Sequence, residues 1–242
     1  MIKVGTCGWA FFRPENFIDE KKKFKSILQA YAYVYPAVEV NSTFYRIPKV
    51  STAEKWREEV NEVNKNFEFT VKATRFITHI LHFTKASVKF FDVMKDICKA
   101  LGAKILLLQS PNSFKATEEN IKRMKNFFDN INREDLIIAW EPRGDWHKKP
   151  EILKEVCKDF EVVECVDPFR NNSLYFGKKK IGYFRMHGFG VISMYSYNFS
   201  KSELGELKNK MKVLLKKLKL QYYFFNNSAM YQNALEFMKM IS

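Results

Sequence analysis

The alternation of short apolar runs with longer amphipathic segments is the feature that most restricts the fold of this chain. Eight apolar or β-branched runs are the expected β-strands, at Ile2–Cys7, Ala37–Asn41, Phe67–Lys72, Lys104–Gln109, Leu136–Glu141, Phe160–Val166, Ile181–Met186 and Gln221–Phe225. Amphipathic segments are the expected helices, at Phe24–Tyr35, Thr52–Val63, Val88–Leu101, Ile121–Phe128, Ile152–Cys157, Leu204–Leu218 and Ala229–Met240. Such an alternation is typical of a parallel sheet, in which each helix returns the chain to the start of the next strand.

The number of strands and the chain length together indicate one α/β barrel. Barrels of eight strands and helices usually take about 250 residues, and this chain has 242. No internal repeat or linker divides it, so residues 1–242 are expected to form a single TIM-like (β/α)8 domain. An open doubly wound sheet is the alternative, but no G-x-G-x-x-G follows the first strand to support a dinucleotide crevice.

Charge and composition restrict the class of partner. Hydrophobic residues make up 46% of the chain and charged residues 28%, which is an ordinary globular balance and excludes a disordered chain. The 41 basic residues exceed the 27 acidic residues by 14. This excess favours an anionic partner, either nucleic acid or a phosphorylated small molecule. The alternative is that lysine clusters such as Lys178–Lys180 are solvated surface.

Cysteine usage and the absence of targeting signals predict the compartment. The four cysteines, at positions 7, 98, 157 and 165, show neither C-x-x-C pairs nor zinc-ribbon spacing. A reduced, cytoplasmic protein is the simplest expectation. The N-terminus does not resemble a signal peptide, and no apolar run approaches the roughly 18 residues that a membrane span requires. We therefore expect no membrane association, and nothing in the sequence points to a protein partner.

Polar side chains close nearly every expected strand. In a parallel barrel the carboxyl ends of the strands form the mouth that holds the active site. The residues expected there are Trp9, Glu39, Asn41, Lys72, His79, Gln109, Glu141, Arg143, Asp167, Arg185, His187, Asn226 and Asn227. Strand alternation directs Glu39 into the barrel, where a buried carboxylate needs a cation as its partner.

These side chains divide by chemistry into two groups. Glu39, Glu141 and His187 are the candidate catalytic acids and bases. The candidate substrate-binding residues are Trp9, Asn41, Lys72, His79, Arg143, Arg185, Asn226 and Asn227. Structural alternatives exist for several: Glu141 and Arg143 can form an ion pair, Asp167 precedes a proline and suits a turn, and the two asparagines can cap the last helix.

The motifs that contain these residues resemble the YecE-like family, grouped as domain of unknown function 72. The resemblance covers nearly the whole chain and rests on Val4–Trp9, Val38–Arg46 with Pro48, Phe67–Ala73 with Ile77–His79, Gln109–Phe114, Glu141–Arg143 with Trp146, Arg185–Gly188, and Phe225–Asn227 with Asn233-Ala234. It implies a TIM-like barrel but no established reaction. Cys7 stands where the family commonly has serine.

Three functions are consistent with the sequence. The first is a hydrolase of phosphate esters, comparable to apurinic-site endonucleases, in which Glu39, Glu141, Asp167 and His187 bind Mg, Mn or Zn. The second is a metal-free isomerase or lyase of a sugar or sugar phosphate, with Lys72 and the arginines holding the anionic group. The third is a protein that binds an anion or nucleic acid without turnover.

Overall fold

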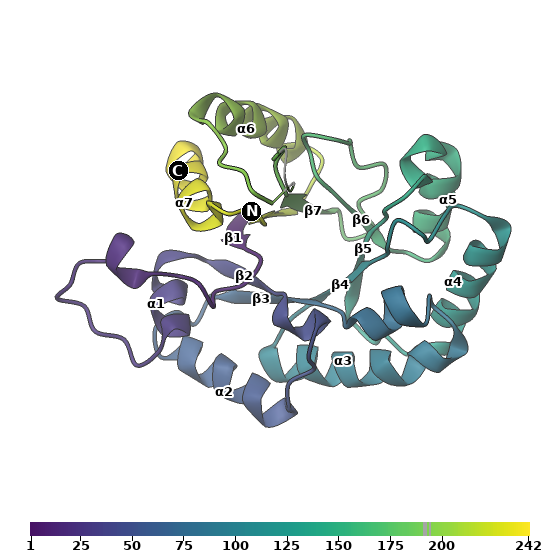
Figure 1. The fold of residues 1–242 in the computed structure, drawn as a ribbon, viewed down its shortest axis with the longest axis horizontal. Helices are drawn as coiled ribbons and strands as arrows, with labels where there is room; N and C mark the ends of the chain where they lie inside the picture. Colours follow the sequence, from purple (N-terminus) through teal and green to yellow (C-terminus); the bar gives the residue numbers. More distant parts are fainter. Residues whose placement is uncertain (191–192, 194) are drawn as a thin grey trace.

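The computed structural model describes residues 1–190, 193 and 195–242, and eight parallel strands in it close into a barrel in sequence order (Figure 1). The strands are β1 (Ile2–Thr6), β2 (Ala37–Val40), β3 (Glu68–Lys72), β4 (Ile105–Gln109), β5 (Ile137–Glu141), β6 (Val163–Val166), β7 (Ile181–Met186) and β8 (Leu220–Phe225). Strand β8 pairs with β1 from Ile2↔Gln221 to Thr6↔Phe225, which completes the ring. The predicted TIM-like barrel is confirmed.

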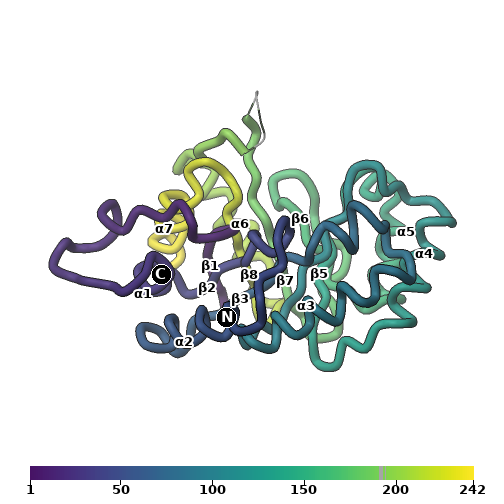
Figure 2. Tube along the Cα trace, turned by 60° about the horizontal axis from the view of Figure 1, so that its bottom comes forward, coloured from purple at the N-terminus to yellow at the C-terminus, as the bar shows by residue number. Residues whose placement is uncertain are grey.

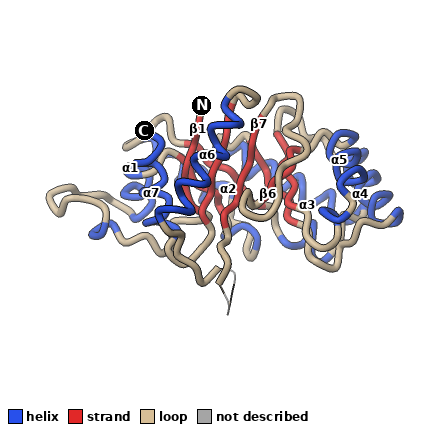
Figure 3. Tube along the Cα trace, turned by 90° about the horizontal axis from the view of Figure 1, so that it is seen from above, coloured by secondary structure: helices blue, strands red, loops and turns tan. Residues whose placement is uncertain are grey.

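Seven α-helices occur in the described part of the chain and flank the strands on either side (Figure 3). They are α1 (Ile27–Val34), α2 (Val50–Asn61), α3 (Val88–Leu101), α4 (Glu118–Asn130), α5 (Pro150–Asp159), α6 (Lys201–Leu215) and α7 (Met230–Ile241). Short 3-10 turns form at Pro14–Asn16, Ser42–Phe44, Lys85–Ser87 and Trp146–Lys148, and a π-helical turn at Phe76–Ile80. None of the described helices is long and apolar enough to cross a membrane.

Local backbone chemistry explains where the observed bounds differ from the expected ones. Helix α6 starts three residues before the expected Leu204, because Ser200 and Glu203 form a reciprocal capping box. Strand β6 starts three residues after the expected Phe160, because Glu161 has φ of 48° and cannot continue an extended strand. Helix α3 ends where expected, at Gly102 in the left-handed conformation with φ of 63°.

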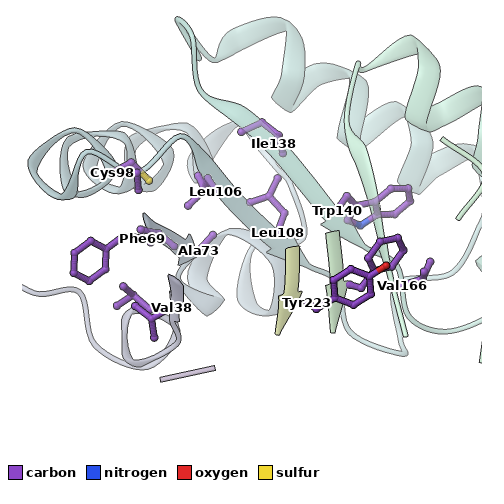
Figure 4. Packing of buried hydrophobic residues seen from close by; sticks show 14 of the residues in the cluster. Val38, Phe69, Ala73, Cys98, Leu106, Leu108, Ile138, Trp140, Val166 and Tyr223 are labelled. Carbon is purple, nitrogen blue, oxygen red and sulfur yellow. The ribbon is translucent and has the colours of Figure 1, made fainter. Parts of the chain in front are cut away.

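The main hydrophobic core lies between the outer faces of the strands and the helices. Figure 4 shows Leu106 and Leu108 of β4 and Phe69 of β3 on the side of the sheet that faces Cys98 of α3. The alternate residues point inward, and Leu107 of β4 belongs to a second cluster that fills the barrel. This period of two directs the polar residue at the end of each strand into the barrel mouth.

The connection from β6 to β7 contains no helix, although every residue of 167–180 is described. An irregular segment covers the outside of β6 instead. The Glu164 amide donates to the carbonyl of Tyr175 at 3.0 Å, and the Leu174 amide donates to Glu164 Oε2 at 2.5 Å. The buried Glu164 side chain therefore attaches the segment to the strand.

Helix α7 returns to the first strand, so the two ends of the chain meet on one side of the barrel. Figure 2 shows yellow α7 close to purple β1, and residues of the two elements lie in contact. The segment after β7 leaves the barrel at the edge opposite the N-terminus (Figure 3). That edge holds the carboxyl ends of the strands, where the active site of a parallel barrel is expected.

Candidate functional site

A buried arginine joins two of the expected catalytic carboxylates. Arg185 of β7 donates from Nη2 to Glu39 Oε1 of β2 at 2.9 Å, and from Nη1 to Glu141 Oε2 of β5 at 2.5 Å. The exposed fractions are 0% for Arg185 and Glu39 and 4% for Glu141. Residues from three separate strands therefore converge, as the strand alternation predicts, but they meet below the mouth and neutralise one another.

The charges in this cluster are fixed by their mutual attraction. Burial by itself raises the pKa of the Glu141 carboxyl, yet the nearby guanidinium groups of Arg143 and Arg185 hold that pKa well below its ordinary value. Burial likewise lowers the pKa of Arg185, but Glu39 and the other neighbours raise it well above the usual value. A carboxylate so strongly stabilised in its charged form is a poor proton acceptor at neutral pH.

Two hydroxyl groups that the sequence analysis missed complete this cluster. The Tyr183 hydroxyl donates to Glu39 Oε2 at 2.8 Å and lies 2.8 Å from Thr70 Oγ1. Tyr183 precedes Arg185 by two residues, and Thr70 precedes Lys72 by two, so each shares the inward face of its strand. The same period of two that identified Glu39 is a signal that could have found them.

His187 and Asp167 form a second pair at the ends of β7 and β6. The His187 backbone amide donates to Asp167 Oδ2 at 3.0 Å, and Nδ1 of the ring lies 3.4 Å from the same oxygen. Nε2 faces Arg143 Nη2 at 3.1 Å. Burial lowers the pKa of the imidazole more than Asp167 and Glu141 raise it, so the ring is neutral near pH 7. Neutral His187 then has a protonated Nδ1 toward Asp167 and an acceptor at Nε2.

Lys72 is a buried cation without a counter-ion among the described residues. Its side chain ends β3, is only 7% exposed, and holds Nζ 4.1 Å above the centre of the Phe44 ring. None of the described side chains forms an ion pair or hydrogen bond with Nζ. Burial and then the nearby Arg185 lower the pKa of Lys72 to about 8, against the opposing effect of Glu39.

His79 and Arg143 lie on the rim beside Lys72. Nδ1 of His79 is 2.8 Å from Thr78 Oγ1, and its ring packs edge-on against Phe44. Burial, followed by the positive charge of Lys72, lowers the pKa of His79 to about 4, so its ring is uncharged at neutral pH. Arg143 pairs with Glu141 at 2.5 Å, and 23% of its side chain remains exposed.

The remaining expected site residues lie in two other places. Trp9 and Asn41 line a pocket beside the mouth, near β1 and β2. Asn227 is buried and donates through Nδ2 to the Tyr197 carbonyl and to Asn233 Oδ1, both at 2.8 Å, so it fixes the segment before α6. Asn226 follows β8 and donates its backbone amide to the Met186 carbonyl at 2.8 Å.

The residues expected to bind a metal do not fit that role. Glu39 and Glu141 contact different amino groups of Arg185, while Asp167 accepts the backbone amides of His187 and Phe169. Across residues 1–190, 193 and 195–242, no group of three or more His, Cys, Asp or Glu side chains is arranged to hold a metal ion. The expected set therefore does not assemble a site for Mg, Mn or Zn.

Comparisons with known proteins identify the family. The family described as "Protein of unknown function DUF72" matches residues 3–242. The UPF0759 protein YunF of Bacillus subtilis is 24% identical over 95% of this chain and 89% of its own length. A DUF72 family protein of Thermotoga maritima has a crystal structure that superposes with a TM-score of 0.78 at 24% identity, covering 100% of this chain and 99% of that one.

A more distant structure shares the fold alone. A xylose isomerase domain containing protein of Salmonella typhimurium superposes with a TM-score of 0.54 at 14% identity, covering 88% of this chain and 89% of that one. The match to the family extends over nearly the whole sequence and includes the motifs at the barrel mouth. The chain belongs to the DUF72 family.

Proposed function

We propose that this protein is a metal-free enzyme that transfers a proton within a small anionic substrate of the sugar-phosphate class, as isomerases and lyases do. The observation that supports this most is the buried Lys72 ammonium, which has no counter-ion among the described residues. A buried charge without a partner is costly, and a bound anion would compensate it. The site is the barrel mouth, where Lys72, His79, Arg143 and His187 lie.

Arg143 supplies the second contact to the anion. Its guanidinium is the partly exposed one of the two arginines in the cluster, whereas Arg185 is fully buried and engaged by two carboxylates. A planar guanidinium fork suits the oxygens of a phosphate or carboxylate. Of the two arginines expected to bind substrate, we therefore assign this role to Arg143 alone, and Arg185 holds the carboxylates in position.

The roles of Lys72 and His187 are proposed from their charge states at neutral pH. Lys72, with its pKa near 8, is protonated and therefore serves as the counter-ion of the bound anion. His187 is neutral, and its Nε2 accepts from Arg143. When Arg143 turns to the substrate anion, Nε2 keeps only the longer contact with Arg185 Nη1, at 3.4 Å, and can accept a proton from a substrate carbon or hydroxyl. Asp167 holds the ring in place through Nδ1.

Phosphate-ester hydrolysis is the second candidate. The net charge of +14 and the anion site favour a phosphorylated or polyanionic substrate. The version expected from the sequence, however, uses a metal ion, and its expected ligands Glu39 and Glu141 are engaged by Arg185. A non-enzymatic anion-binding protein would also have the Lys72 site. It would have no need for Asp167 to hold the His187 ring in one orientation.

The test is direct binding followed by a proton-exchange measurement. Calorimetric titration with ribose 5-phosphate is expected to show binding that Lys72→Met weakens at least tenfold. Lys104→Met removes an exposed lysine at the opposite end of the barrel and serves as the matched control. NMR in D2O should then show exchange of a carbon-bound substrate proton, which His187→Gln abolishes without loss of binding. Binding of free ribose that equals binding of its phosphate would refute the proposal.

A further inference from the structure

A pocket of about 420 Å³ opens beside the cationic mouth, and five of its eleven lining residues are aromatic. Its aromatic lining residues are Trp9, Phe11, Tyr45, Trp56 and Tyr231. Cys7 belongs to the same wall, and its Sγ lies 3.6 Å from Arg185 Nη2, so the pocket borders the buried charge cluster. Phe11 and Tyr45 are 80% and 70% exposed, which makes the pocket accessible from solvent.

One short turn, Ser42–Phe44, separates the pocket from Lys72. Ser42 lines the pocket, while the Phe44 ring lies under Nζ of Lys72 at 4.1 Å. Between them, Thr43 Oγ1 donates to the Lys72 carbonyl at 2.6 Å and ties the turn to β3. The ammonium and the aromatic pocket are therefore neighbours on the two sides of one short turn.

The walls of the pocket select the kind of chemical group that it accepts. A sugar ring can lay its C–H face on an aromatic side chain, but the hydroxyl groups at its edge need hydrogen-bond partners, and few side chains of this lining are polar. A flat heteroaromatic ring has the matching shape and few polar groups. Trp9 and Trp56 meet edge to face at 5.1 Å, so each ring leaves a face or edge for such a group.

Two residues that line this pocket, Asn41 and Tyr231, each have a buried polar atom without a hydrogen-bond partner among the described residues. The Oδ1 atom of Asn41, a residue that lines the pocket, is buried and accepts no hydrogen bond from any described residue. An unsatisfied buried acceptor carries an energetic cost that a ligand donor can remove. A ring with an N–H or amino group at its edge provides that donor after a small shift of the amide.

We infer that the natural ligand is a nucleotide-like molecule, whose phosphate binds Lys72 and Arg143 and whose heteroaromatic ring occupies the pocket lined by Trp9 and Tyr45. This inference rests on the proposed function, because it uses the same anion site. It narrows the substrate class from any sugar phosphate to one that carries a planar ring on the sugar. The ribose then spans the turn Ser42–Phe44.

Three probes separate the contribution of the ring from that of the phosphate. Adenosine 5′-monophosphate has both groups, ribose 5-phosphate has only the anion, and adenosine has only the ring. Trp9 and Trp56 line the pocket, whereas the other two tryptophans of the chain, Trp140 and Trp146, are fully buried. Quenching of tryptophan fluorescence therefore reports ring binding, and calorimetry gives the affinities.

Substitutions in the pocket and at the mouth should have different signatures. Stacking of one base contributes about 1–3 kcal/mol, or roughly 5- to 150-fold in affinity. Trp9→Leu and Tyr45→Ala should therefore weaken binding of adenosine 5′-monophosphate on the order of tenfold and leave the affinity for ribose 5-phosphate unchanged. The unchanged affinity also shows that the variants are folded. Lys72→Met should weaken both phosphates. Tyr33→Leu changes an exposed aromatic residue of α1 outside the pocket and should change nothing.

The results that overturn the inference differ from those that overturn the proposed function. If adenosine 5′-monophosphate binds no more tightly than ribose 5-phosphate, and Trp9→Leu has no effect, the ring pocket is refuted while the anion site stands. If neither phosphate binds, the proposed function fails, and the inference fails with it. Equal weakening of both phosphates by Trp9→Leu would show that this residue shapes the mouth itself and would also overturn the inference.

Discussion

Replacing Arg185 with methionine should be one of the most destabilising single substitutions in this barrel. The change leaves Glu39 buried at 0% exposure with only neutral hydrogen-bond partners, the Tyr183 hydroxyl and the Cys7 thiol, while Glu141 retains Arg143. Removing one member of a buried ion pair typically costs about 3–5 kcal/mol, because the remaining charge is uncompensated. For a chain of this size each kcal/mol lowers Tm by roughly 2–4 °C, so a loss of about 6–20 °C is expected.

Equilibrium unfolding in guanidinium chloride, together with thermal scans, measures this cost. The double variant Arg185→Met with Glu39→Gln should recover part of the loss, since it removes the uncompensated carboxylate. Arg185→Lys keeps the charge but cannot bridge both carboxylates, so its stability should be intermediate. Arg123→Met is the control, because it removes an exposed ion pair on α4 and should cost less than about 1 kcal/mol. A loss in Arg185→Met no greater than in Arg123→Met would refute this reasoning.

Four further predictions follow from the charges and contacts described above. Anion affinity should fall as pH rises through about 8, because the Lys72 ammonium then loses its proton; calorimetry across that range checks this, and a Lys72→Met variant that keeps the same pH dependence would contradict it. Burial raises the pKa of Glu164 to about 7, above its unfolded value, so folded-state stability is lost as pH rises from the ordinary carboxyl range through about 7. Above pH ~8, Glu164→Gln should therefore exceed the wild type in free energy of unfolding by up to about 3 kcal/mol and should unfold at a higher temperature. In mild acid the two proteins should unfold at the same temperature. No difference at either pH would show that the pKa of this carboxyl is not raised. Exhaustive chelation should leave Tm and ribose 5-phosphate affinity unchanged, and a large drop in either, restored by added Mg, Mn or Zn, would count against the metal-free site. Binding of ribose 5-phosphate should depend weakly on salt, whereas short abasic DNA, if it binds across the basic surface, should lose affinity steeply between two salt concentrations because it releases many counter-ions.

The inward-pointing polar residues could be predicted because strand alternation is a local property. Because side chains alternate along a strand, Val38 and Val40 face the apolar sides of the helices outside the barrel, and Glu39 between them points inward. The same argument applies to Arg185, which follows Tyr183 by two residues on β7. Convergence of these groups then follows from the closed, parallel topology alone.

The partner of each charge could not be predicted, because it depends on the stagger between strands. Glu39 and Arg185 are separated by 146 positions in sequence, and only the barrel geometry brings them to 2.9 Å. From the sequence alone, Glu39 and Glu141 are therefore equally suited to bind a metal or to transfer protons, and Lys72 is one of several cations near them. In the structure, Arg185 pairs with both carboxylates, whereas Lys72 forms no ion pair with a described residue, so Lys72 becomes the stronger candidate for anion binding.

Only one aromatic residue of the pocket, Trp9, could be predicted as a site residue from the sequence. Trp9 was noticed because it follows the first strand, but Tyr45, Trp56 and Tyr231 come from a turn and two helices that no local pattern connects. The contact of Asn227 was equally hidden. Its position after β8 predicts contact with substrate or a cap, and no sequence pattern indicates that its amide nitrogen donates to the Tyr197 carbonyl, 30 residues away.

No helix lies between β6 and β7, so the hydrogen bonds between these two strands, here called the β6–β7 seam, are weakly shielded from solvent. Elsewhere a helix covers each crossover, but here irregular chain attached through Glu164 protects the ladder, in which Cys165 pairs with Tyr183 and Val166 with Phe184. Amide hydrogens along this seam should exchange with solvent by local opening at a lower free energy than those of β4 and β5. Asp167 and His187, the proposed base, extend from these same two strands, so both would sample alternative positions at the rate of this local opening.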